Sequence, residues 1–227
     1  MVPPLLELKD VWAVRGGTVA LREISAAFPH GARVGLFGTG GSGKTTLLKL
    51  IAGLFHPSRG ELRWAEPPRA IGMVFQRDAL FDSLPLLRNV ELPLRDAPPG
   101  EAQAAATRAL AAVGLSPADA QKLPAELSGG MRKRAGIARA LCGSPPVKLY
   151  DEPSAGLDPA TEREILDLLW RSHDPSGLTV VATSDPRQLW QRCDLVVLLA
   201  AGRLAAFGAP RELLGSPVAR EAFGEGP

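Results

Sequence analysis

Alternating apolar and polar residues dominate the first thirty positions, and this two-residue period predicts β-strands. The segment 5–28 is expected to be an antiparallel β-rich opening, with Gly16 and Gly17 as a turn between its strands. Apolar runs predict further strands at residues 33–37, 61–64, 70–75, 147–150, 178–183, 195–199 and 203–207. Helices are expected between several of them, at residues 44–54, 161–171 and 187–191. This alternation predicts an α/β fold with a parallel sheet whose faces are covered.

The stretch between Gln76 and Pro146 has a different character. Residues 102–113 consist of strong helix formers with almost no β-branched residue, and Gly114 follows as a stop signal. A second helix is expected at residues 130–141. We therefore predict an inserted α-helical subdomain at residues 77–145, within a core formed by residues 1–76 and 146–227.

The composition is that of an ordinary globular protein, with 45% hydrophobic and 22% charged residues in a chain of 227. A net charge of +2 gives no reason to expect a nucleic-acid partner. Cys142 and Cys193 fit neither a disulfide framework nor a zinc motif, which favours reduced, buried thiols in a cytosolic protein. The first ten residues are too short in their apolar part, and too early in their charges, to lead us to expect a secretory signal, and the longest apolar run, residues 195–201, is shorter than the ~20 residues of a membrane span.

A glycine-rich segment, GTGGSGKTT, lies between the apolar run 33–37 and the amphipathic stretch 47–51. A strand, a glycine loop and a helix in this order are typical of a phosphate-binding P-loop. Glycines let successive N–H groups turn inward around an anion, and the lysine adds positive charge for the β- and γ-phosphates. The alternative is a glycine-rich turn that binds nothing. The predicted nucleotide-binding residues are Gly38, Thr39, Gly40, Gly41, Ser42, Gly43, Lys44, Thr45 and Thr46, with Thr45 also a Mg²⁺ ligand.

The run VKLYDEP provides a second nucleotide element. Asp151 ends an apolar strand and is suited to hold Mg²⁺ through water, while Glu152 is suited to act as the general base. Such a pair is common by chance, and it gains weight only behind a P-loop. Lys148 is unusual in this strand because a buried lysine is costly, so we expect it where the strand reaches solvent.

The segment LSGGM, residues Leu127, Ser128, Gly129, Gly130 and Met131, discriminates between P-loop families. By itself it is an ordinary serine N-cap before a helix. The order GTGGSGKTT, Gln76, LSGGM, LYDEP and SAGLD, however, resembles the nucleotide-binding subunits of ATP-binding cassette (ABC) transporters over essentially the whole chain. The resemblance implies a P-loop NTPase fold: a RecA-like core, an antiparallel β subdomain and the inserted helical subdomain. It also implies an ATPase that uses ATP and Mg²⁺.

The resemblance assigns further roles position by position. Gln76 resembles the glutamine that senses Mg²⁺ and couples the site to a transmembrane permease, and the LSGGM segment resembles the signature that closes on ATP held by a second subunit. Ser154 and Asp158 resemble the loop that touches the neighbouring P-loop in a head-to-tail dimer. The simpler alternatives are a solvated strand-end residue for Gln76 and a helix N-cap for Asp158.

Two positions depart from the family pattern. Ser184 stands where the family has a histidine that contacts the γ-phosphate, so hydrolysis is expected to be slower or to depend on Glu152 alone. Arg15 stands where an aromatic residue stacks on adenine, a role that a guanidinium plane can also fill. Trp12 is another candidate for the base, although core packing suits it better.

The segment VFQRDALFDSLPLLRNVELPLRD, Met131 and Arg15 resemble the Mla-type (Mce-linked) lipid-transport ATPases. This predicts phospholipid transport with a lipid-binding Mce/Mla-type partner, on the cytoplasmic face of the cell membrane. The alternatives are an importer or exporter ATPase for another small molecule and a weakly hydrolytic regulatory subunit. A cassette protein of ribosomes or DNA repair fits the length less well, since such proteins usually have two cassettes or a long coiled-coil insertion.

Overall fold

The computed structural model describes residues 3–76, 79–187 and 189–213, which fall into two compact units. Unit 1 comprises residues 1–68, 149–151 and 173–227, and unit 2 comprises residues 69–148 and 152–172. Unit 2 is larger than the expected helical segment 77–145, because it also contains β5 (Ile71–Val74) and α5 (Pro159–Arg171).

An antiparallel sheet of three strands opens unit 1. It consists of β1 (Leu6–Arg15), β2 (Thr18–Phe28) and β4 (Arg59–Trp64), in the order β2-β1-β4. Arg15 pairs with Thr18, so Gly16 and Gly17 form a two-residue turn, with φ angles of 52° and 78°. Such a turn requires positive φ at both positions, which glycine adopts at little cost. The antiparallel opening and its turn are confirmed.

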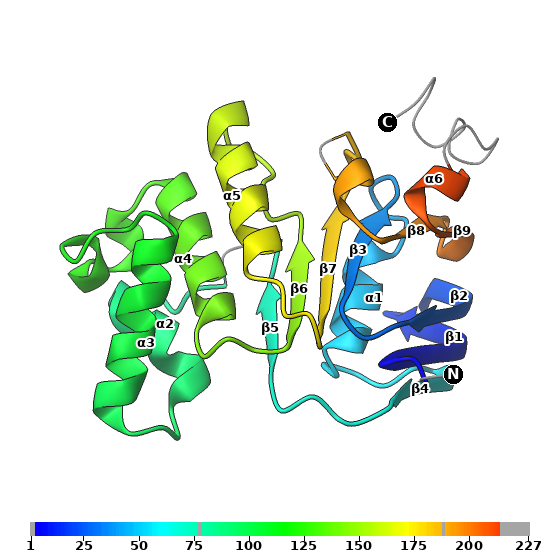
Figure 1. The fold of residues 1–227 in the computed structure, drawn as a ribbon, viewed down its shortest axis with the longest axis horizontal. Helices are drawn as coiled ribbons and strands as arrows, with labels where there is room; N and C mark the ends of the chain where they lie inside the picture. Colours follow the sequence, from blue (N-terminus) through cyan, green and yellow to red (C-terminus); the bar gives the residue numbers. More distant parts are fainter. Residues whose placement is uncertain (1–2, 77–78, 188, 214–227) are drawn as a thin grey trace. The chain divides into compact units, whose positions relative to one another are not determined.

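The second sheet of unit 1 contains the strands that bear the expected site. They are β3 (Ala32–Phe37), β7 (Leu178–Thr183), β8 (Leu195–Ala200), β9 (Arg203–Gly208) and the end of β6 (Val147–Asp151), in the order β6-β7-β3-β8-β9 (Figure 1). β3 runs parallel to β7 and β8, as predicted. β9 is antiparallel to β8, so the expectation of a wholly parallel sheet is wrong there. The two-residue turn Ala201-Gly202 explains the difference, since so short a connection joins only antiparallel neighbours.

The helices of unit 1 are shorter than expected. α1 (Lys44–Ile51) ends three residues before Leu54, because Gly53 turns the chain with a φ of 70°. The helix expected at residues 187–191 is replaced by the single 3-10 turn η4 (Trp190–Arg192), and Gln188 lies outside the described residues. A last short helix, α6 (Pro210–Leu213), was not predicted.

Unit 2 is mainly helical (Figure 1). The predicted helices are confirmed as α3 (Pro99–Ala112) and α4 (Gly129–Leu141), whereas α2 (Leu86–Glu91) was missed. Short 3-10 helices fill the connections, at η1 (Leu92–Leu94), η2 (Asp119–Gln121) and η3 (Pro124–Glu126). Small residues allow close packing: a Cβ on Gly72 of β5 would lie 2.1 Å from the carbonyl oxygen of Ala140 in α4.

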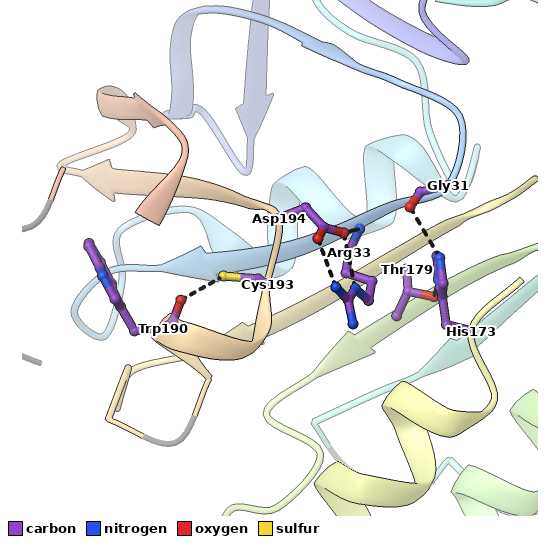
Figure 2. A network of polar contacts seen from close by, with 7 residues as sticks. All are labelled: Gly31, Arg33, His173, Thr179, Trp190, Cys193 and Asp194. Atoms are coloured by element: carbon purple, nitrogen blue, oxygen red, sulfur yellow. Dashed lines mark hydrogen bonds and ion pairs between the residues drawn. The ribbon is translucent and has the colours of Figure 1, made fainter. Parts of the chain in front are cut away.

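A polar network holds the amino-terminal ends of the strands in unit 1 (Figure 2). Arg33 at the start of β3 makes a two-pronged ion pair with Asp194, with nitrogen–oxygen distances of 2.8 and 3.0 Å. The His173 ring lies 2.9 Å from Thr179 Oγ1 and 3.2 Å from the Gly31 carbonyl oxygen. These contacts anchor β3 and β7 at the end opposite to the glycine loop.

The burial of Lys148 differs from the expectation. Lys148 is only 3% exposed, so the expectation that it reaches solvent is wrong. All five residues of its strand, β6, are buried, and Lys148 lines a cavity together with residues of α3 and α4. In the part of the chain that the structure describes, none of the helices combines the length and the apolar character that a membrane crossing needs.

Both cysteines are free and buried, as predicted. Burial raises the pKa of Cys142 and of Cys193 to about 11, because a thiolate loses solvation away from water. Cys193 also donates a hydrogen bond to the Trp190 carbonyl oxygen at 3.3 Å (Figure 2).

We therefore expect neither thiol to react quickly with a disulfide reagent in the native protein at pH 8. At that pH both groups are protonated, because it lies well below their raised pKa, and only the thiolate attacks a disulfide. Colorimetric titration should detect both thiols in denaturant. Rapid reaction of one thiol in the folded protein would contradict this prediction.

Candidate functional site

The glycine loop follows β3 at its carboxyl end and leads into α1. Gly38 and Gly43 have φ angles of 151° and 106°. A Cβ on Gly38 would lie 2.3 Å from the carbonyl oxygen of Leu199, so no other residue fits there. A Cβ on Gly40 or Gly41 would meet nothing within 4 Å. The base of the loop is therefore tightly packed while its crest is open, as the approach of a phosphate to the backbone requires.

Lys44 reaches back into the loop from the first position of α1. Its ammonium group donates hydrogen bonds to the carbonyl oxygens of Gly38 at 2.6 Å and Thr39 at 3.2 Å, and the residue is 7% exposed. The buried hydroxyl of Ser42 makes no hydrogen bond among the described residues. A buried hydroxyl without a partner is costly, and a polar group bound in the loop would satisfy it. The loop thus fits a phosphate group in both charge and hydrogen-bonding capacity.

The register of β3 against β7 brings other predicted residues to the same edge. Phe37 pairs with Thr183, so Gly38 and Ser184 leave neighbouring parallel strands side by side. β6 lies on the other side of β7 and ends at Asp151, which is 1% exposed. Ser184 is exposed. Carboxyl ends of adjacent parallel strands are a common place for ligand sites in α/β proteins.

Arg15 lies at the end of β1, with its guanidinium carbon 4.1 Å from the centroid of the Phe55 ring. The aromatic ring therefore covers one face of the guanidinium plane. Trp12 is flanked instead by two cations, Arg22 and Arg59, at 5.7 and 5.8 Å from its ring. Because two cations already lie against the Trp12 ring, Arg15 is the better of the two predicted residues for stacking on a base.

In unit 2 the predicted Gln76 and two of the five predicted signature residues line one cavity of about 470 Å³. Gln76 contributes from the end of β5, and Gly129 and Gly130 contribute from the start of α4. The wall is completed by Arg132, Lys133, Ala155, Gly156 and Leu157. The positive end of the helix dipole and the positive charge of Arg132 make this cavity suitable for an anion.

The signature serine has a structural role in this structure. Ser128 Oγ accepts a hydrogen bond from the Met131 N–H at 3.2 Å and so caps α4. Leu127 is buried beside it, whereas Gly129 is exposed. The simple N-cap interpretation is therefore correct for the side chain of Ser128, and the proposed contact with a nucleotide is additional to it.

The segment after β6 is strained at its first residue. Glu152 has a φ of 49°, a left-handed conformation that costs a residue with a Cβ about 1–3 kcal/mol. Ser154 is pinned to α5 by a hydrogen bond of 2.7 Å to Glu162. Asp158 caps α5 by accepting from the N–H groups of Ala160 and Thr161, each at 3.1 Å. Hydrogen bonds from Thr161 also lower the pKa of Asp158.

Three residues with organising roles were missed from the sequence. Phe55 lies under Arg15, and Lys133 is a buried cation in the signature helix. Asn89 is fully buried, accepts from the Phe81 N–H at 2.7 Å and donates to the Leu84 carbonyl oxygen at 2.8 Å. Phe55 and Lys133 act through contacts with residues distant along the chain, which local patterns do not reveal, whereas the partners of Asn89 lie five to eight residues before it.

A protein-family model described as "ABC transporter" matches residues 21–155, which is more than half of the chain. The chain belongs to the ABC transporter family. The fold is that of an ABC ATPase cassette, a P-loop NTPase fold with a helical subdomain, and the predicted fold class is confirmed.

Curated ABC relatives cover most of this chain. A methionine import ATP-binding protein MetN of Caulobacter vibrioides is 39% identical, covering 89% of this chain and 66% of that protein. The MetN of Thermobifida fusca is 38% identical, covering 98% and 75%. A sulfate/thiosulfate import ATP-binding protein CysA 1 of Chromobacterium violaceum is 36% identical, covering 96% and 65%. The chain thus spans about two thirds of the length of several of these relatives.

Solved structures agree with this assignment. A dimeric structure of MJ0796, described as a bacterial ABC transporter cassette, has a TM-score of 0.82 at 30% identity, covering 91% of this chain and 99% of that one. A second dimeric structure of MJ0796, in a post-hydrolysis state bound to ADP and Pi, has a TM-score of 0.81 at the same identity and coverage.

Replacing Ser184 by histidine should raise the rate of ATP hydrolysis. Ser184 leaves β7 beside the glycine loop, where an imidazole reaches further than a hydroxyl toward a bound phosphate. Steady-state phosphate release measures the effect, with Ser184→Ala as the control that should match the natural protein. A large loss of activity in Ser184→Ala would show instead that the hydroxyl itself is required.

Proposed function

We propose that this chain is the ATP-hydrolysing subunit of an ABC importer. The observation that carries the proposal has two parts. Unit 1 contains a glycine loop that holds the Lys44 ammonium group, and unit 2 contains a cationic cavity at the start of α4, the helix that follows the signature turn. The relatives' names describe import ATP-binding proteins, which favours import over the lipid transport suggested by the segment around Gln76. An Mce/Mla-type lipid-binding partner finds no support among these relatives, and lipid transport remains the alternative.

Residues of unit 1 bind the nucleotide and its metal. The open crest at Gly40 and Gly41 and the Lys44 ammonium take the β- and γ-phosphates, and Arg15 stacks on the adenine. Thr45 and Asp151 would supply oxygens to hold Mg²⁺, which when bound would offset negative charge on the phosphates during transfer.

Residues of unit 2 complete the reaction. Glu152 accepts a proton from the attacking water as general base, and Gln76 adds a further oxygen ligand for Mg²⁺. The signature turn, from Leu127 to Met131, contacts the γ-phosphate held by a second copy of an ATP-binding subunit, in a head-to-tail dimer. Ser154 and Asp158 lie in the loop that faces the partner's glycine loop. ATP binding closes this dimer, and hydrolysis reopens it.

The loop after Gln76 is the proposed contact with a transmembrane permease. Within residues 79–85 of this loop, the Asn89 side chain hydrogen-bonds to the backbone N–H and carbonyl oxygen of Phe81. The Phe81 side chain is 55% exposed although it is large and apolar. An adjacent groove of about 390 Å³ is lined by residues of α2, η1 and the start of α3, among them Leu84, Arg88 and Leu92. An exposed aromatic beside such a groove suits a short helix of the permease. The chain is then located on the cytoplasmic face of the cell membrane, bound to that permease.

The variant Glu152→Gln tests the hydrolytic part of the proposal. It should bind ATP and form a dimer, because glutamine keeps the shape of glutamate and the residues that bind the phosphates are unchanged, but its turnover should fall by at least about 100-fold when the base is lost. Phosphate release and size-exclusion chromatography with ATP measure the two effects. Lys44→Ala serves as a control that should lose nucleotide binding itself. Unchanged turnover in Glu152→Gln would refute the assigned role.

Complementation tests the direction and the solute. The chain, produced in a bacterium that lacks its own methionine import ATPase but retains the permease, should restore uptake of radiolabelled methionine. Glu152→Gln should not restore it, since closure without hydrolysis cannot complete a cycle. Radiolabelled sulfate and phospholipid transfer are measured in parallel. Restoration of phospholipid transfer alone would favour the lipid-transport alternative.

A further inference from the structure

The first two turns of α4 (Gly129–Leu141) carry an unusual amount of positive charge. Arg132 ends the first turn, Lys133 and Arg134 follow it in the second, and the helix contains no acidic residue. The amino end of a helix already has a partial positive charge, so cations at this end are unfavourable. Lys133 is in addition only 9% exposed, and burying an ammonium group costs solvation. Helix stability therefore does not explain a lysine at this position.

The Lys133 side chain points to the segment that follows Glu152. Its ammonium group donates a hydrogen bond of 2.6 Å to the carbonyl oxygen of Ala155. The backbone N–H of Ala155 in turn donates to the carbonyl oxygen of Glu152 at 3.3 Å. Two consecutive hydrogen bonds thus connect the signature helix to the backbone of Glu152.

The turn at Glu152 needs such support because it is strained. Glu152 holds a φ of 49°, and conformations of this kind persist only where the surroundings enforce them. Glu162 of α5 accepts a hydrogen bond from Ser154. Asp158 caps the start of the same helix. Lys133 supplies the restraint from α4.

Lys133 and Ala155 also line the same cavity as Gln76 and Gly130. A ligand that enters this cavity therefore reaches both the hydrogen bond between Lys133 and Ala155 and the start of α4. Movement of α4 in response to such a ligand is transmitted to Ala155, because a charged donor bonded at 2.6 Å resists separation from its acceptor.

We propose that Lys133 is a positioning residue that aligns Glu152 for hydrolysis by tying the turn at Ala155 to the signature helix. This inference rests on the proposed role of Glu152 as the general base. Lys133 does not contact the nucleotide in this proposal; it acts through the backbone of Ala155. Docking of the signature helix on a second subunit thereby sets the direction of the carboxylate in the same chain.

Steady-state kinetics of Lys133→Met test the proposal. Methionine has a similar length and no donor, so kcat should fall by about 10- to 100-fold while the KM for ATP is unchanged, since misplacing a reacting group costs rate and not ground-state binding. Lys133→Arg restores a donor and should recover most of kcat. Arg163→Met is the matched control: Arg163 is an exposed cation on α5 that also donates to a carbonyl oxygen, and its loss should change nothing.

A second readout separates positioning from nucleotide contact. In a Glu152→Gln background, ATP-driven dimer formation should be the same with Lys133 and with methionine at this position. If the double variant dimerises less well, or if KM rises in Lys133→Met, the lysine binds nucleotide and the proposal is wrong. A kcat equal to that of the natural protein in Lys133→Met also overturns it.

Folding and the underlying role of Glu152 are checked separately. The Tm is recorded for each variant, and if Lys133→Met does not fold, Lys133→Leu replaces it, because leucine also lacks a donor for the Ala155 carbonyl oxygen. A reduced kcat with unchanged KM in Lys133→Leu supports the proposal, and an unchanged kcat contradicts it. Full turnover in Glu152→Gln alone would refute the proposed base, whatever Lys133 does.

Discussion

The parallel pairing of β3 with β7 is the constraint on which the arrangement of unit 1 depends. A slip of one residue would move every side chain of these strands to the opposite face of the sheet, so the register must be held firmly. Arg33 with Asp194 and His173 with Thr179 secure the amino-terminal ends, and Phe37 stacks on Trp190 at the other end, with 5.5 Å between the ring centroids. With that register, Gly38 and Ser184 emerge next to one another.

In unit 2, the same residues serve folding and the proposed chemistry. Ser128 and Asp158 cap their helices, and caps of this kind each stabilise a protein by about 1 kcal/mol. The start of α4 also lines the cavity in which an anion held by a second subunit would be bound. A replacement at either position therefore affects stability and activity together, and only the two measured side by side separate them.

Most of the fold followed from the sequence, because strand and helix periods, glycine turns and helix caps are local signals. The strands β3, β7 and β8 and the helices α3 and α4 were all predicted. The misjudged elements are short and give weak periodic signals: α2 has six residues, and the 3-10 turn η4 at Trp190–Arg192 has three. Motif order identified the loop, the signature and the family. The contacts of Phe55, Lys133 and Ala155 were not accessible, since they join residues that are separated by 22 or more positions.

The strained backbone of Glu152 has a consequence for behaviour on heating. A left-handed residue relaxes as soon as its neighbours release it, and helix ends open at far lower free energy than the protein as a whole. Fraying of the first turn of α5 would free Ser154 and Asp158, and with them the glutamate. Warmth should thus abolish turnover through a local, reversible opening, at temperatures where spectroscopic probes still register an intact molecule.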